Sequence, residues 1–195
     1  GAYSRHPLIR VPTGVGIIWK QRLFDWQLNS TETPSLNQRK IELMRGKVLG
    51  GSSAINAMSH VRGAPADYDG WHDAGCDGWS YDEVAPFFRK SENWIGLPTD
   101  HRGCGGPISV SPAQSADPLY EAWFEAAKSC GHKVIEDYNA LPHGVPLEGF
   151  ARSQQTIGNG YRVTASSAYL EGQQNRPNLC ILTQTQVTRI NFVGN

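Results

Sequence analysis

Residues 45–70, RGKVLGGSSAINAMSHVRGAPADYDG, decide how the rest of the chain is interpreted. Two adjacent glycines, Gly50 and Gly51, are followed at once by Ser52 and Ser53. Paired glycines let a backbone come close to a ligand, because no Cβ stands in the way. Small hydroxyl residues at a helix start leave backbone N–H groups free to face an anion. The turn therefore indicates either a phosphate- or pyrophosphate-binding loop or an ordinary connection from a loop into a helix.

The sequence around this turn, RGKVLGGSSAINAMSHVRG followed by DYDGW at 67–71, resembles the glucose-methanol-choline (GMC) oxidoreductases, a family of FAD-dependent alcohol oxidases and dehydrogenases. It is most similar to the choline-dehydrogenase-like branch. Further matches follow in the family's order and cover nearly the whole chain: GWSYDEVAPFFRKSE (78–92), GGP (105–107), EGF (148–150), NGYR (159–162), AYL (168–170) and RPNL (176–179). One position departs from the pattern, since His60 stands where the family usually carries an aromatic residue or alanine.

Composition limits the class of protein. The chain has 195 residues, enough for one domain or two small ones. Lys and Arg number 18, as do Asp and Glu, so a formal net charge of zero favours no nucleic-acid or anionic-membrane partner. There is no apolar run of about 18 residues and no signal-peptide pattern, so no membrane span is expected and the compartment stays open. The four cysteines form no CxxC or Cys/His cluster, which predicts buried thiols and no metal site.

The resemblance implies a mixed α/β (α+β) fold. It predicts part of an FAD-binding domain over residues 1–95, the start of a substrate-binding domain with an antiparallel sheet over 96–178, and a return to the FAD-binding domain over 179–195. The family opens with a strand, a GxGxxG turn and a helix that hold the ADP half of FAD, and this sequence contains no GxGxxG. The chain is therefore expected to be an internal fragment, whose partners are the missing segments of the same enzyme, in the same polypeptide or as other chains.

Local patterns predict several helices, one of them over residues 162–172. Residues 54–58 read as the first turns of a helix after the glycine pair. Ser80 and Glu83 have the spacing of a capping box, so a helix should begin there. Residues 117–129 should form another, because Asp can cap it, Pro follows at the first position and Gly131 ends it.

Turn and strand patterns occupy the last third of the chain. Residues 158–160, Gly-Asn-Gly, are expected to form a hairpin or loop turn with positive φ angles. Two runs rich in β-prone side chains, 179–183 and 187–193, predict strands.

The resemblance also implies where FAD is held. Three groups of positions match family residues that lie against the pyrophosphate and ribityl chain, beside the isoalloxazine ring, and against the adenine. In that order they are Val48, Gly50, Gly51 and Ser52; Asn56, Ala57, Met58 and Ser59; and Val187. The Asn56 side chain can both donate and accept hydrogen bonds, which suits flavin heteroatoms. Some members carry a histidine at the position of Ile55 that bonds covalently to the flavin, so FAD should be non-covalent here.

Catalysis in the family needs a histidine base, which takes the hydroxyl proton as hydride leaves the carbinol for flavin N5. The base and its His or Asn neighbour are expected beyond the end of this chain, and none of its six histidines matches them. No catalytic or metal-binding residue is therefore assigned, and the chain alone should not turn over alcohols. His60 is nearest the flavin motif, where it either touches the cofactor or substrate or bonds to backbone or water.

Three functions stay open at this point. The first is an FAD-dependent alcohol oxidoreductase, which converts a small-molecule alcohol to an aldehyde or ketone by hydride transfer to flavin. The second is a hydroxynitrile lyase, which holds FAD on the same fold. The third is a non-catalytic binding domain that keeps the scaffold without a working cofactor site.

Overall fold

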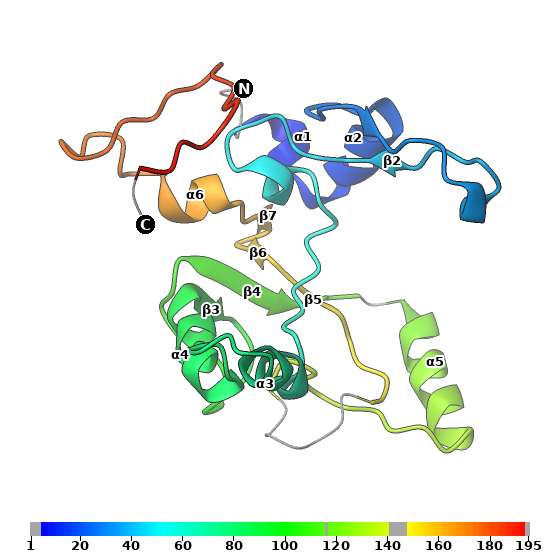
Figure 1. The fold of residues 1–195 in the computed structure, drawn as a ribbon. Coiled ribbons are helices and arrows are strands. Elements are labelled where there is room, and N and C mark those ends of the chain that lie inside the picture. Colours follow the sequence, from blue (N-terminus) through cyan, green and yellow to red (C-terminus); the bar gives the residue numbers. More distant parts are fainter. Residues whose placement is uncertain (1–4, 116, 141–147, 194–195) are drawn as a thin grey trace. The chain divides into compact units, whose positions relative to one another are not determined.

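The computed structural model describes residues 5–115, 117–140 and 148–193 (Figure 1). The chain divides into two compact units, Gly1–Asn56 with Thr164–Asn195, and Ala57–Val163. Both contain helices and short strands, so the mixed α/β fold is confirmed. The assignment of residues 1–95, 96–178 and 179–195 to cofactor and substrate domains stays a prediction, because compactness does not say which ligand a unit binds.

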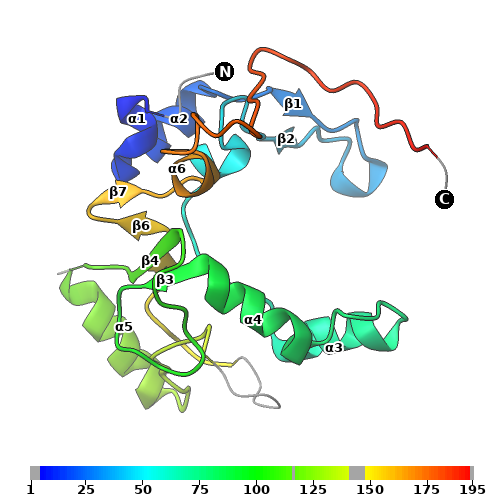
Figure 2. The same cartoon turned by 90° about the vertical axis from the view of Figure 1, so that its left-hand side faces the viewer.

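The first unit is built mainly from short helical segments. They are α1 (Pro7–Arg10), η1 (Pro12–Gly14), α2 (Val15–Gln21), η2 (Pro34–Leu36), η3 (Gly51–Ala54) and α6 (Ala165–Tyr169). Proline opens α1, η1 and η2, where its fixed φ suits a helix start and its missing N–H costs nothing. The strands β1 (Leu28–Asn29) and β2 (Glu42–Leu43) pair antiparallel, as Figure 2 shows.

The core of the first unit forms around the glycine turn. Ile9 and Ile18, from the first two α-helices, pack with Val48, Ala54 and Ile55, and all five are buried. Burial of such aliphatic side chains is the main favourable term in folding. Because Val48 precedes the turn and Ala54 and Ile55 follow it, the turn is anchored to this core at both ends.

The second unit places three helices beside short strands. The helices are α3 (Pro65–Asp73), α4 (Tyr81–Ser91) and α5 (Pro118–Ser129), and α3 lies against α4 (Figures 1 and 2). The strands are β3 (Glu92–Trp94), β4 (Ile108–Pro112), β5 (Gln154–Gln155), β6 (Ile157–Gly158) and β7 (Tyr161–Arg162). A sheet of order β3-β4-β5 has β3 parallel and β5 antiparallel to β4, so the expected antiparallel sheet is mixed. The strands β6 and β7 form a separate hairpin.

Predictions that depend on neighbouring residues are confirmed. The backbone N–H of Ser80 donates to Glu83 Oε2 at 3.0 Å, which completes the capping box of α4. The Asp117 carboxylate caps α5, which ends at Ser129. In the β6–β7 hairpin, Asn159 and Gly160 have φ of 51° and 79°, the left-handed values that such a turn requires.

The helix expected at residues 54–58 is wrong. A single 3₁₀ turn covers Gly51–Ala54, and Ile55 leaves the helical region with φ −127° and ψ −4°. Met58 has φ 64°. The backbone then pairs elsewhere, because the Thr156 N–H donates to the Met58 carbonyl at 2.9 Å. The Met58 carbonyl is therefore satisfied by a residue far along the chain, just after β5, and not by a following turn of helix.

The strands expected at 179–183 and 187–193 are also wrong. Within the described ranges, neither segment joins a sheet. Their apolar side chains are exposed, with Leu182 at 73% and Val187 at 78%. The preference of such residues for strands comes from packing on a half-buried sheet surface. These side chains are exposed and have no such surface to pack on, so the preference has no effect here.

Two expectations from composition can be compared with the structure. The four cysteines are free thiols with exposed side chains, so the prediction of buried thiols is wrong: they are Cys76, Cys104, Cys130 and Cys180. In the part of the chain that the structure describes, no helix is both long and apolar enough to cross a bilayer.

Candidate functional site

The glycine turn has the geometry that its sequence predicts. Gly50 and Gly51 have φ of 94° and 59°, values that residues with a Cβ rarely adopt. A Cβ at Gly46 would lie 2.2 Å from the Gly51 carbonyl oxygen, so the two backbones touch only because Gly46 has no side chain. A Cβ at Gly51 would meet no atom within 4 Å. The Gly51 backbone therefore faces open space, where a ligand can approach it.

The two serines after the glycines hold the turn in place. The Gly46 N–H donates to Ser52 Oγ at 3.1 Å. The Ser53 hydroxyl donates to the Gly50 carbonyl at 2.6 Å and accepts from the Ala165 N–H at 2.9 Å, which joins the turn to the start of α6. These side chains thus fix the loop conformation, in addition to any contact that Ser52 makes with a ligand.

A cavity of about 590 Å³ lies beside the turn within the first unit. Its lining comes from Trp26, residues 46–49 and residues 182–186. The volume lies in the range of small-molecule sites. The Val48 side chain is buried in the core of the first unit. Val187 directly follows the opposite wall but does not line the cavity.

Asp25 supports the entrance to the turn, and the sequence analysis missed it. The carboxylate accepts hydrogen bonds from the Arg45 N–H at 2.8 Å and from Arg22 Nε at 3.0 Å. Burial by itself raises the pKa of Asp25. Hydrogen bonds and charge, chiefly from Arg45 and Arg22, together lower it by more than burial raises it, so the pKa lies below its ordinary value. The only signal in the sequence was one carboxylate between two aromatic residues, Phe24 and Trp26.

Ile55 has a structural role in the first unit. Its side chain is 2% exposed, and its carbonyl accepts a hydrogen bond from Trp19 Nε1 at 2.6 Å. An aliphatic side chain offers no atom that could bond to a flavin.

Residues 58–60 extend the sheet of the second unit at its β5 edge. The Thr156 N–H donates to the Met58 carbonyl at 2.9 Å, and the His60 N–H donates to the Gln154 carbonyl at 2.8 Å. Between them, Ser59 forms an antiparallel bridge with Gln155. Met58 is buried and Ser59 is exposed, as alternation along a strand requires.

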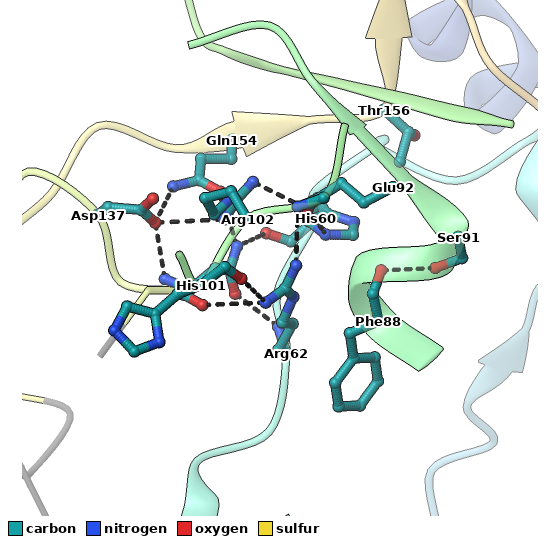
Figure 3. Close-up of polar contacts among 12 residues, drawn as sticks. His60, Arg62, Phe88, Ser91, Glu92, His101, Arg102, Asp137, Gln154 and Thr156 are labelled. Carbon is teal, nitrogen blue, oxygen red and sulfur yellow. Dashed lines mark hydrogen bonds and ion pairs between the residues drawn. The ribbon is translucent and has the colours of Figure 1, made fainter. Parts of the chain in front are cut away.

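His60 contacts a buried carboxylate, an outcome outside both sequence-based interpretations. Its Nε2 lies 3.2 Å from Glu92 Oε1, and the Glu92 side chain is 1% exposed (Figure 3). Arg62 Nη2 donates to Glu92 Oε2 at 2.8 Å, and Arg102 Nη2 lies 2.9 Å from Oε1. We call these four residues the Glu92 cluster. Glu92 and Arg102 lie 30 or more positions from His60 and Arg62, and no local pattern connects the two pairs.

Nearby positive charges and a backbone donor favour the ionised form of Glu92. Burial raises the pKa of Glu92, but the contact with His60, the Gly103 N–H and the two arginines together bring it below its ordinary value. Burial also lowers the pKa of Arg102, which Glu92 and Asp137 partly offset. A buried carboxylate and two arginines can persist because each has a charged or hydrogen-bonding partner.

The positions expected to bind the cofactor fall in both units. The first unit holds Val48, Gly50, Gly51, Ser52, Asn56 and Val187, and the second holds Ala57, Met58 and Ser59. Within the first unit, residues 46–49, which precede the glycine pair, and residues 182–186, which precede Val187, line one cavity. Asn56, Ala57 and Ser59 are exposed. The assignment of these residues to FAD stays a prediction.

The family model of the GMC oxidoreductases matches residues 26–195, so the chain belongs to this family. Among curated relatives, it is 40% identical over 173 residues to the oxygen-dependent choline dehydrogenase of Brucella anthropi; the match covers 89% of this chain and 31% of the relative. The chain thus spans about a third of the length of the curated relatives it matches.

Solved structures support the same family. The pyridoxine 4-oxidase of Mesorbium loti superimposes with a TM-score of 0.85 at 32% identity, over 97% of this chain and 37% of that one. An FAD-dependent oxidoreductase of Chaetomium thermophilum gives a TM-score of 0.82 at 30% identity, over 97% of this chain and 34% of that one.

Proposed function

We propose that this chain is part of an FAD-dependent alcohol oxidoreductase, which oxidises a small-molecule alcohol to an aldehyde or ketone by hydride transfer to flavin. The observation that carries the proposal is the glycine turn inside the GMC signature, whose Gly51 backbone faces open space beside a cavity of about 590 Å³. The relatives are named dehydrogenases and oxidases, which favours oxidation over the lyase alternative.

The residues present fit FAD. The turn has no Cβ where the backbone must approach a ligand, and a cofactor-sized cavity adjoins it. Val48, Gly50, Gly51 and Ser52 would lie against the pyrophosphate and ribityl chain, and Val187 against the adenine. When bound, FAD supplies the hydride acceptor. Because Ile55 is aliphatic, the cofactor is held without a covalent bond.

The segment after the turn would contact the flavin ring. Asn56 has an exposed amide that can donate and accept, so it can orient ring heteroatoms. Ala57 and Ser59 are exposed, and Met58 contributes a left-handed kink that directs the chain between them. These residues bind and orient the cofactor, and the general base is not assigned to any residue of this chain.

The test begins with an absorption spectrum of the purified, desalted full-length protein that contains this chain, and its intact mass verifies that more than these 195 residues are present. We expect flavin absorption that an alcohol bleaches in the absence of oxygen. Choline is the first alcohol to try, because it is named in the curated relatives. Absence of flavin, or flavin that no alcohol reduces, would contradict the proposal. Cleavage of a cyanohydrin without bleaching would establish the lyase function instead.

A further inference from the structure

The backbone of residues 58–60 is held from a second side as well as by β5. The His60 carbonyl accepts hydrogen bonds from the Tyr138 hydroxyl at 3.0 Å and from Asn139 Nδ2 at 2.9 Å. The Tyr138 hydroxyl also accepts from the Gln154 N–H at 2.7 Å. Two residues further along the chain, the Arg62 N–H donates to Asn139 Oδ1 at 2.7 Å. One tyrosine and one asparagine therefore fix this segment to β5.

The Glu92 cluster fixes the side chains that flank the same backbone. His60 and Arg62 both reach the Glu92 carboxylate, one at each oxygen (Figure 3). Glu92 Oε2 also accepts the Gly103 N–H at 2.8 Å, so the carboxylate joins this segment to the loop that follows β3. With an exposed fraction of 1% for Glu92 and 5% for Arg62, water screens these charges little.

Residues 58–60 include one energetically unfavourable backbone conformation, the positive φ of Met58. A left-handed φ is unfavourable at a residue with a side chain, such as Met58. Such conformations persist when the surrounding structure over-determines them, and they concentrate at functional sites. Here the hydrogen bonds from Tyr138 and Asn139 and the contacts with Glu92 supply that surrounding structure. Met58 and Ser59 are the residues that the proposed function puts beside the flavin ring.

We infer that Glu92 is a positioning residue: through His60 and Arg62 its buried carboxylate fixes residues 58–60 against β5, and so sets where the flavin-side residues of this unit lie. The part that concerns flavin rests on the proposed function. The part that concerns the backbone does not, because it follows from contacts within one unit.

The first arm of the test is amide hydrogen exchange of the intact protein without flavin. In Glu92→Gln we expect exchange at His60 and Thr156 to become about tenfold faster or more, with α5 unchanged, because local opening is governed by local contacts. Glu92→Asp, which keeps the charge, should give an intermediate rate. Glu125→Gln is the matched control, since Glu125 pairs with Lys128 at 2.8 Å on an exposed face of α5. Unchanged exchange at His60 and Thr156 would overturn the inference.

A second variant keeps the test decisive if Glu92→Gln does not fold. His60→Ala removes the imidazole that lies 3.2 Å from Glu92 Oε1 and leaves Glu92 paired with Arg62 and Arg102. Faster exchange at residue 60 and at Thr156 with α5 unchanged supports the inference, and parental exchange overturns it.

The second arm uses the FAD-loaded protein and measures the visible dichroism and midpoint potential of the bound flavin. Glu92→Gln should raise the potential, because loss of the carboxylate leaves two buried arginines that favour the reduced, more negative flavin. Glu92→Asp should return it toward the parental value. A parental potential and dichroism in Glu92→Gln, with exchange accelerated, would overturn the link to the cofactor. A parent protein that binds no flavin would instead refute the proposed function, while the exchange result would still stand.

Discussion

Replacement of Asp25 by Asn should destabilise the first unit and loosen the entrance to the glycine turn. The Asp25 residue is 7% exposed, and its two oxygens accept hydrogen bonds from the Arg45 N–H at 2.8 Å and from Arg22 Nε at 3.0 Å. An amide of nearly the same size keeps one acceptor oxygen, but its NH₂ group must face a donor. The substitution therefore removes one hydrogen bond and the negative charge with little change in volume.

The expected magnitude follows from these contacts. A hydrogen bond to a charged group contributes about 1.5–3 kcal/mol of net stability. The Arg22 side chain, which loses its partner, is 21% exposed and so keeps part of its hydration. We therefore expect the free energy of unfolding to fall by about 2–3 kcal/mol. This is less than the loss expected when one partner of a fully buried ion pair is removed.

Urea denaturation at neutral pH, followed by tryptophan fluorescence, measures this loss. Glu42→Gln is the matched control, because Glu42 approaches the same Arg22 at 3.8 Å but is 65% exposed. An exposed ion pair contributes little, so the control should change stability by less than about 0.5 kcal/mol. Equal losses in the two variants would refute the argument that burial of Asp25 makes its carboxylate important.

Comparison of the parent protein with Asp25→Asn at several pH values tests the pKa of Asp25. Its pKa is lowered in the folded state, so the carboxylate stabilises the fold above the ordinary Asp pKa of about 3.9. That contribution is lost as the pH falls through the folded-state pKa. The stability difference between the parent and Asp25→Asn should therefore shrink on acidification, and a difference that stays constant with pH would contradict the lowered pKa.

Three further predictions follow from the turn, the core and a helix cap. Gly51→Ala should weaken FAD binding about tenfold or more, because its Cβ would enter the space where a ligand approaches the backbone. Gly172 also has a positive φ and open space around it, so Gly172→Ala is the control. It should lower the free energy of unfolding by about 1 kcal/mol and leave the affinity for FAD unchanged. Quenching of flavin fluorescence on titration measures both affinities, and equal values would contradict the assignment of Gly51. Acid precipitation should release all the flavin, because Ile55 offers no atom for a covalent bond, and a pellet that stays yellow would refute this. Ser80→Ala should lower the free energy of unfolding by about 1 kcal/mol in urea denaturation, since it removes the cap of α4; an unchanged midpoint would show that the capping box contributes nothing.

The parts of the fold that the sequence predicts well are those with local causes. The capping box of α4 needs only Ser80 and Glu83, three positions apart, and the hairpin turn needs only Asn159 and Gly160. The glycine turn is likewise specified by its own residues, and its assignment to FAD stays a prediction.

The parts that the sequence does not predict depend on distant partners. Arg62 and Glu92 are 30 positions apart, and the His60 carbonyl and Asn139 are 79 apart. The chain pattern gives no sign that these residues meet, and a buried carboxylate looks the same in sequence as an exposed one. Residues 54–58 are mispredicted for the same reason, since their apolar residues suit a helix, whereas the Met58 carbonyl accepts its hydrogen bond from the distant Thr156 N–H.

Pairing of residues 58–60 with β5 also restricts how the length of this segment can vary. Side chains on a strand alternate between two faces, so a one-residue insertion exchanges the faces of everything beyond it. Here it would carry His60 away from Glu92 and turn the exposed Ser59 inward. A deletion would have the same effect in the opposite direction. Homologous chains that use this arrangement should therefore tolerate substitutions between residues 57 and 62 far better than any change in the number of residues.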